Sequence, residues 1–238
     1  MNSVVAGITY RAVLGRRRVL LLLLLPLLLI GLAILLRALG STSEDAAVRL
    51  MQVYAVGTML PLLGLIAGTG TIAPEIDDGT IIHLLSKPIS RPVIAVTKFA
   101  VAASLLALFA AVPTYVAGYI ILGNEAGIAA GFALGALVGG IAYAGVFLFL
   151  GVVTRHAVTV GIIYAVVWEN LVGGYVQGAK NLSIQQWAQT IAAQVSTSSF
   201  FEATVSAGFA VPAVLIVTVG SVLWAGRRLR SVSLAGEE

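Results

Sequence analysis

The chain gathers many of its charged side chains in one stretch, residues 71–92, which reads TIAPEIDDGTIIHLLSKPISRP. Six charged residues lie between Glu75 and Lys98, although the whole chain has only 14 basic and 10 acidic residues. Carboxylates crowd the start of the stretch, where a helix dipole favours negative charge, and Lys87 and Pro88 close it. The acidic head comprises Glu75, Asp77 and Asp78. Ion pairing with a partner surface is the chemistry that such a helix supports.

The same stretch also carries an apolar stripe. Ile81, Leu84 and Leu85 recur at helical spacing, which a merely solvated loop would not need. One interpretation is a helix over residues 75–91 that docks into a partner protein. The other interpretation is a helix that lies on a membrane surface.

Patterns for catalysis and metal binding are missing from the sequence. A P-loop needs a lysine directly after glycine, and none of Lys87, Lys98 and Lys180 follows one. His83 and His156 have no second type of metal ligand nearby, and the chain has no cysteine. No Ser, His and Asp set can be placed around a common site. We therefore expect no catalytic residue, metal or cofactor in this chain, which is not expected to be an enzyme.

The composition is that of a membrane protein. The chain is 59% hydrophobic and 10% charged, with a mean hydropathy of +1.03, whereas soluble domains are about 25% charged. In lipid, backbone groups are satisfied only in helices or closed barrels, and the continuous apolar runs lack the alternation of a barrel. The expected fold class is an all-α integral membrane protein. The net charge of +4 does not indicate nucleic acid, because the basic residues flank apolar runs.

The apolar runs predict six transmembrane helices in a single domain, residues 1–238. The expected spans are about 19–39, 51–73, 93–122, 126–153, 156–176 and 205–226. Between and around them lie an N-terminal interfacial helix (1–18), the loop of the charged helix (74–92), an external amphipathic segment (177–204) and a tail (227–238).

Two alternatives remain at the N-terminus. A cleaved signal peptide could replace the first span, since a small-residue triplet ends at Gly40. The length of the apolar run and Arg37 at its exit favour a retained span. Residues 1–18 fit either an interfacial helix or an ordinary basic flank.

Lysine and arginine residues set the expected orientation. With a cytoplasmic N-terminus, eleven of them lie inside, namely Arg11, Arg16, Arg17, Arg18, Lys87, Arg91, Lys98, Arg155, Arg227, Arg228 and Arg230. Three lie outside, namely Arg37, Arg49 and Lys180. Because positive charge concentrates on the cytoplasmic side, both termini and the charged helix are expected there. The expected location is the plasma membrane, which in a bacterium is the inner membrane.

The fifth span is interrupted by Glu169. Twelve uncharged residues before it are too few to cross, so the carboxylate lies in the outer part of the membrane or the chain turns there. Trp168 and Glu169 are the candidate external gate, and the alternative is a helix-end carboxylate among the outer headgroups.

Ser183 and Gln186 then form a capping-box pattern, which begins the amphipathic helix of an outer re-entrant hairpin.

The fourth span carries a glycine at every fourth residue, at Gly131, Gly135 and Gly139. Small residues at this spacing let helix backbones approach closely. We interpret the stripe as helix packing within the bundle rather than as a functional groove.

Residues Glu75 to Arg91, EIDDGTIIHLLSKPISR, resemble the signature of ABC (ATP-binding cassette) type-2 transporter permeases. In that family E-x-x-x-G-T leads through a Leu-rich helix to a K/R-P-[IV]-S-R turn between spans two and three. The matching residues are Glu75, Gly79, Thr80, Leu84, Leu85, Lys87, Pro88, Ser90 and Arg91. Asp77 and Asp78 depart from it, because mixed or basic charge is expected there. The six-span layout, the outer hairpin and WENL at residues 168–171 are also similar to the family.

This resemblance implies the permease subunit of an ATP-driven ABC exporter. Such a subunit dimerises with a second copy or a paralogue and binds two cytoplasmic ATPase subunits, on which ATP and magnesium are expected. The charged helix would be the coupling helix, with Asp77 and Asp78 among its contacts, and Arg155 and His156 would form a second, smaller contact. Largely uncharged spans favour an amphipathic or lipid-like substrate, and membrane lipid is an expected partner.

Two other classes of function fit the same sequence less well. One is a membrane module that transmits ATPase-driven conformational change, or anchors a complex, without moving a substrate. The other is a proton-coupled carrier, for which Glu169 is the one group in the spans suited to the role.

The predicted orientation is testable with single cysteines, because the chain has none of its own. Ser43→Cys and Ser183→Cys are expected to react with an impermeant thiol reagent added outside the cell. Ser86→Cys and Ser231→Cys are expected to react only after the membrane is opened. Labelling of Ser86→Cys from outside would reverse the orientation.

Overall fold

The computed structural model describes residues 2–73, 75, 90–123, 125–173, 176, 178–198, 201 and 203–231. Within these residues all regular structure is helical, which confirms the all-α part of the predicted fold class. Most of the predicted charged helix, residues 76–89, lies outside the described part of the chain.

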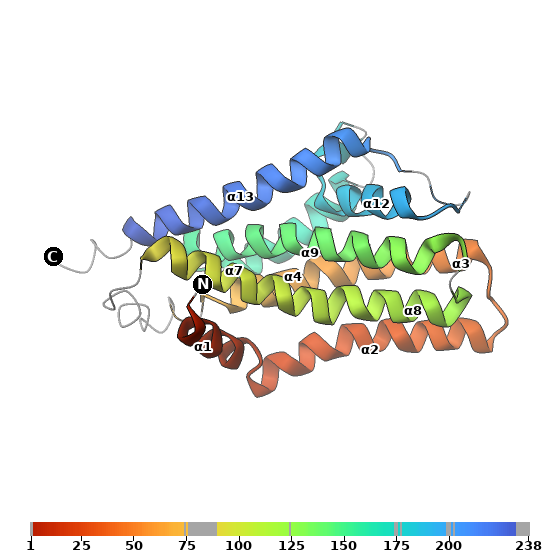
Figure 1. Cartoon of the computed structure of the whole chain (residues 1–238), viewed down its shortest axis with the longest axis horizontal. Helices are drawn as coiled ribbons and strands as arrows, with labels where there is room; N and C mark the ends of the chain where they lie inside the picture. The colour runs from red at the N-terminus through yellow and green to blue at the C-terminus, as the bar shows by residue number, and fades with distance from the viewer. Residues whose placement is uncertain are drawn as a thin grey trace.

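The long helices lie side by side in one elongated bundle (Figure 1). In chain order the elements are α1 (Ser3–Val13), α2 (Arg16–Ala38), α3 (Glu44–Arg49), η1 (Leu50–Met59), α4 (Leu60–Gly70), α7 (Arg91–Leu106), η2 (Ala107–Ala111), α8 (Val112–Leu122), η3 (Glu125–Gly127), α9 (Ile128–Val153), α10 (Ala157–Ile163), η4 (Tyr164–Val172), η5 (Lys180–Leu182), α12 (Ile184–Val195) and α13 (Ala207–Ser231). Helix α1 and the last turns of α13 lie at one end, here called the α1 end, on the left of Figure 1. Helix α3 and the last turn of α8 lie at the opposite end, here called the α3 end.

Among the described residues, five helical stretches are long and apolar enough to cross a membrane, whereas the sequence predicted six. They are Val19–Ala38, Glu44–Gly70, Arg91–Leu122, Glu125–Val153 and Ala207–Leu229. The segment predicted as the fifth span forms a shorter apolar helix, Ala157–Val172. At 1.5 Å per residue that helix reaches about 24 Å, less than the roughly 30 Å of hydrocarbon. The chain is therefore a multi-pass membrane protein with five clear spans, and the sixth crossing stays a prediction.

Two spans continue through a proline by changing their helical pitch. Pro61 and Pro113 stand in the first turns of α4 and α8, directly after the π-helical stretches η1 and η2. A proline ring clashes with the carbonyl four residues earlier and offers no N–H to it. The wider π turn relieves that clash, so each span runs on as one helix.

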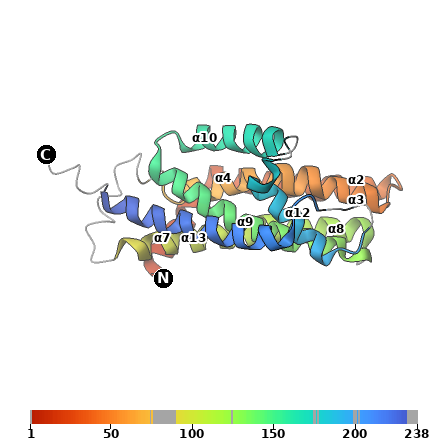
Figure 2. The same cartoon turned by 90° about the horizontal axis from the view of Figure 1, so that it is seen from above.

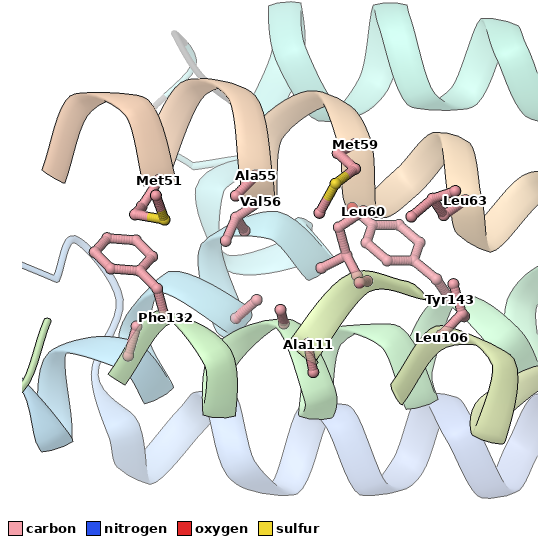
Figure 3. Close-up of a cluster of buried hydrophobic side chains, with 14 of the residues drawn as sticks. Met51, Ala55, Val56, Met59, Leu60, Leu63, Leu106, Ala111, Phe132 and Tyr143 are labelled. Atoms are coloured by element: carbon pink, nitrogen blue, oxygen red, sulfur yellow. The ribbon is translucent and has the colours of Figure 1, made fainter. Parts of the chain in front are cut away.

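The core of the bundle is centred on α9, which contacts α4, α7, α8, α12 and α13. Figure 3 shows part of it, where Met59, Leu60 and Leu63 of the second span lie near Tyr143 of α9. Helix α4 approaches α9 closely through glycine, since a Cβ on Gly64 would lie 2.7 Å from the Tyr143 Cβ. In lipid such close van der Waals packing, rather than the hydrophobic effect, holds helices together.

A second and smaller group of buried side chains lies where helices end near the α1 end, and we call it the end cluster. It consists of Ile72, Ala95, Leu148, Val152, Ala225 and Leu229. These residues come from the chain just after α4, the first turns of α7 and the last turns of α9 and α13. The end cluster therefore joins four helices close to the point where the chain leaves the bundle for residues 76–89.

Candidate functional site

Lys98 is a fully buried cation that joins two helices. Its side chain is 0% exposed, and its Nζ donates to the Thr71 carbonyl at 2.5 Å and to Glu75 Oε1 at 2.7 Å. Glu75 is the last described residue before residues 76–89, and its side chain is 18% exposed. A buried ammonium is tolerated only when it is paired and hydrogen-bonded. Lys98 of α7 therefore holds the chain at the end of α4 in place.

The chain is held again where it re-enters the bundle. Arg91, the first residue of α7, donates from Nη1 to the Leu229 carbonyl of α13 at 3.3 Å. Helices α7 and α13 also come close at Gly226, where a Cβ would lie 3.5 Å from the Pro92 Cα. Residues 76–89 are thus connected to the bundle through an anchor on each side.

The turn between α9 and α10 lies beside the first of these anchors. A Cβ on Gly151 of α9 would lie 3.0 Å from Ile72 Cγ2, and Gly151 precedes the turn by three residues. In the turn Arg155 and His156 are both exposed, and the His156 N–H donates to Thr154 Oγ1 at 3.1 Å. The two segments predicted to contact a partner therefore leave the same end of the bundle.

The structure describes four of the residues predicted for partner contact and places them at the α1 end, namely Glu75, Arg91, Arg155 and His156. The others lie outside the described residues, namely Asp77, Asp78, Gly79, Thr80, Leu84, Leu85, Lys87 and Pro88. The sequence prediction for this site missed Lys98 and Thr71. The available signal was a lysine within an apolar run, which a membrane span tolerates only with a partner.

Glu169 is the centre of a second buried polar site. It is 0% exposed, and four groups donate to its carboxylate. Oε1 accepts from the Tyr164 hydroxyl at 2.7 Å and the Ile184 N–H at 3.2 Å, and Oε2 accepts from Ser183 Oγ at 2.5 Å and the Gln185 N–H at 3.2 Å. The carboxylate thus occupies the N-terminus of α12, where unpaired amides and the helix dipole favour an anion.

Ser183 caps this helix as the sequence predicted, but the Gln186 half of the capping box is not formed, because Gln186 Oε1 accepts from Thr204 Oγ1 at 2.7 Å and the Ser183 N–H donates to the Lys180 carbonyl. The Ser183 side chain is 0% exposed, which contradicts the labelling from outside expected of Ser183→Cys. Its Oγ also accepts from the Gln186 N–H at 3.2 Å, which confirms Ser183 as the N-cap of α12. Two indole groups fix the preceding loop, because Trp168 Nε1 donates to the Leu182 carbonyl at 3.3 Å and Trp187 Nε1 donates to the Asn181 carbonyl at 2.9 Å.

The glycine stripe of α9 lies against α12. A Cβ on Gly131 would lie 2.6 Å from the Ala192 carbonyl oxygen, and one on Gly139 would lie 2.8 Å from Ala188 Cβ. Gly135 faces the backbone of Ala188 between them. Helix α12 therefore runs lengthwise along α9 at backbone contact (Figure 1).

This packing sets the depth of Glu169 in the bundle. Glu169 accepts from the Ile184 N–H, one turn before Ala188, and a Cβ on Gly139 of α9 would lie 2.8 Å from Ala188 Cβ. At 1.5 Å per residue, Gly139 lies about 16 Å from Ile128 and about 21 Å from Val153, the two ends of α9. Glu169 is therefore near the middle of the bundle, where the chain turns, and not at the level of the outer headgroups.

The two sites hold neighbouring segments of the bundle together. Both consist of charged groups whose hydrogen bonds go to neighbouring helices. Among the described residues, no three His, Asp or Glu side chains lie together as metal ligands.

Comparison with known protein families identifies the family of this chain. The family model of ABC-2 family transporter proteins matches residues 14–179, a stretch that includes both Lys98 and Glu169. The chain belongs to this family. No curated protein sequence matches it. Membership makes it a membrane permease component of an ABC transporter, a class of subunit that is typically non-catalytic and works with an ATPase.

Removal of the Glu169 carboxylate is expected to loosen the start of α12. Glu169→Ala leaves the donors of Tyr164, Ser183, Ile184 and Gln185 unsatisfied, at a cost of about 1–3 kcal/mol for a buried polar group. Hydrogen exchange at the Ile184 and Gln185 amides should accelerate about tenfold or more, and the melting temperature of the purified chain should fall.

The control is Glu125→Gln at the α3 end, since Glu125 is exposed. That variant is expected to leave exchange in α12 unchanged. Unchanged exchange in Glu169→Ala would mean that the carboxylate does not hold the helix.

Proposed function

We propose that this chain is the permease subunit of an ATP-driven exporter, working with two cytoplasmic ATPase subunits that bind ATP and magnesium. Membership of the ABC-2 family supports a role as transporter component. Export, a dimer formed with a second copy or a paralogue, and cytoplasmic termini are further parts of the proposal. Residues 75–91 serve as the coupling helix, and Arg155 with His156 forms the second contact to the ATPase.

The observation that carries the proposal is the pair of anchors on either side of residues 76–89. On one side Glu75 is bonded to Lys98, and on the other side Arg91 is bonded to the Leu229 carbonyl. A displacement of a segment held at both ends passes to the helices that hold it. Here those helices are α4, α7 and α13, which meet α9 in the end cluster. A loop that only rests on lipid has no need of such anchors.

Glu75 acts in this proposal through Lys98. Its Oε1 lies 2.7 Å from Lys98 Nζ, so the carboxylate is engaged inside the chain. We assign Glu75 as a positioning residue that fixes where the coupling helix begins. Contact with the ATPase surface then falls to the residues that follow, among them Asp77, Asp78 and the stripe of Leu84 and Leu85.

The sixth crossing is completed by two pieces of chain. Helices α10 and η4 run from the α1 end to the turn at Glu169, and α12 continues along α9 to Gly127, where Val195 is in contact. Figure 2 shows α10 along one side of the bundle. With cytoplasmic termini the α3 end is external. Trp168 and Glu169 then form the inner part of the external gate, near the middle of the bundle, and α12 extends from them to the α3 end.

An apolar groove supports an amphipathic or lipid-like substrate. It has a volume of about 310 Å³ and lies between α2, α4 and α10. Leucine, isoleucine and valine line it, with Thr69 as the one polar residue. Such a surface favours an alkyl or aromatic group over a bare ion.

The proposal predicts that loss of Lys98 separates ATP hydrolysis from transport. Lys98→Met leaves the Glu75 carboxylate without its cation, and removal of one partner of a buried pair costs about 3–5 kcal/mol. Purified with its ATPase and placed in vesicles, this variant should still hydrolyse ATP but move less than about a tenth of the substrate. Glu75→Gln, which keeps a hydrogen-bond acceptor, should show an intermediate loss.

The matched control is Arg49→Gln, because the Arg49–Asp45 pair is exposed and worth little. It should leave transport at the wild-type rate. Wild-type transport by a folded Lys98→Met variant would contradict the coupling role. Hydrolysis without substrate movement in the wild-type complex would instead favour a membrane module that transmits conformational change.

A further inference from the structure

A groove with an apolar wall and a cationic rim lies on the outside of the bundle at the α1 end. It has a volume of about 460 Å³ and is lined by Phe149, Val153, Trp224, Arg227 and Arg228. Two neighbouring helices supply these residues, α9 the first two and α13 the other three. The function proposed above uses none of them.

The side chains that line the groove lie on one face of each of the two helices. Phe149 and Val153 are four residues apart on α9, and Trp224 and Arg228 are four residues apart on α13, so each pair occupies one helix face. The Phe149 and Trp224 rings pack with their centroids 6.0 Å apart. Phe149 also packs against the end cluster, to which Leu148, Val152 and Ala225 belong.

The wall of the groove faces away from the bundle. Trp224 is 61% exposed and Val153 is 46% exposed, although both belong to membrane-spanning helices. The Trp224 indole N–H donates to no residue that the structure describes. An exposed tryptophan near the end of a span is typical of the level where acyl chains meet headgroups.

The charge of the groove lies where these spans end. Helix α9 ends at Val153, and Arg227 and Arg228 follow Trp224 by three and four residues. Both arginines are exposed, and within the described part of the chain no carboxylate forms an ion pair with Arg227. The apolar wall lies at the depth of lipid acyl chains, and the guanidinium groups lie at the depth of the headgroups. The groove therefore suits an amphipathic molecule that has an apolar tail and an anionic head.

We propose that this groove binds an anionic phospholipid. The phosphate group is held by Arg227 and Arg228, and one acyl chain lies along Phe149, Val153 and Trp224. Bound there, the lipid seals the junction of α9 and α13 over the end cluster. The site is separate from the apolar groove proposed for the substrate between α2, α4 and α10.

Native mass spectrometry of the purified full-length chain tests this site. The chain is mixed with equal amounts of phosphatidylglycerol and phosphatidylcholine that carry identical acyl chains. Each basic residue near anionic lipid contributes about a factor of five, so two arginines predict about a twenty-fivefold preference for phosphatidylglycerol. Arg227→Gln combined with Arg228→Gln should bring the preference close to one. Trp224→Ala should reduce binding of both lipids by the same factor.

The control variant is Arg37→Gln, which removes an arginine at the α3 end and should keep the full preference. Equal binding of the two lipids by the wild-type chain would overturn the proposal. So would a preference that survives in the double arginine variant. Displacement of the lipid by soluble glycerol phosphate would also overturn the proposal, because the groove would then bind an anion and not a phospholipid. If the double variant keeps its lipid preference but loses the ATPase, the surface belongs to that partner.

Discussion

The buried ammonium group of Lys98 is the constraint on which the rest of this structure depends. A cation without access to water must be paired, and Lys98 finds its partners in the Thr71 carbonyl and the Glu75 carboxylate. Both partners lie where the second span has ended, so the pairing fixes the exit of the chain relative to α7. Arg91 does the same for the point of return against α13. The segment that carries the family motif is therefore attached to the ends of several spans at once.

A second charge, on Glu169, organises the opposite half of the bundle. Its carboxylate satisfies the first amides of α12 and so allows a helix to begin in the middle of a membrane bundle. Small residues make that position possible, since Gly131, Gly135 and Gly139 let α12 reach the backbone of α9. The two buried charges thus lie at two places where the helical chain is interrupted. One holds the chain where it leaves the bundle for residues 76–89, and the other holds the junction with α12.

The sequence predicted those features that depend on local pattern. Long apolar runs such as 19–36 indicate spans wherever they occur, and Ser183 with Gln186 marks the start of α12 without further information. The family motif between Glu75 and Arg91 was also readable from the residues alone. The match of the ABC-2 family model over residues 14–179 confirms that resemblance.

Features that depend on contacts between distant residues were not predictable in the same way. The partners of Lys98 lie 23 and 27 residues away along the chain, and no periodicity connects them. The depth of Glu169 was equally hidden, because it follows from the packing of α12 on α9 rather than from the length of the apolar run. For the same reason the fifth predicted span has the right position but is too short to count as a span by itself.

The central claim is that residues 75–91 and the turn at Arg155 contact an ATPase at the α1 end. Site-specific cross-linking tests it most directly, since the chain contributes no cysteine of its own. Leu84→Cys, Arg155→Cys and Glu125→Cys would each be joined to the copurified ATPase by a short thiol-to-amine reagent. We expect covalent adducts from Leu84→Cys and Arg155→Cys and none from Glu125→Cys at the α3 end. An adduct from Glu125→Cys, with none from Leu84→Cys, would contradict it.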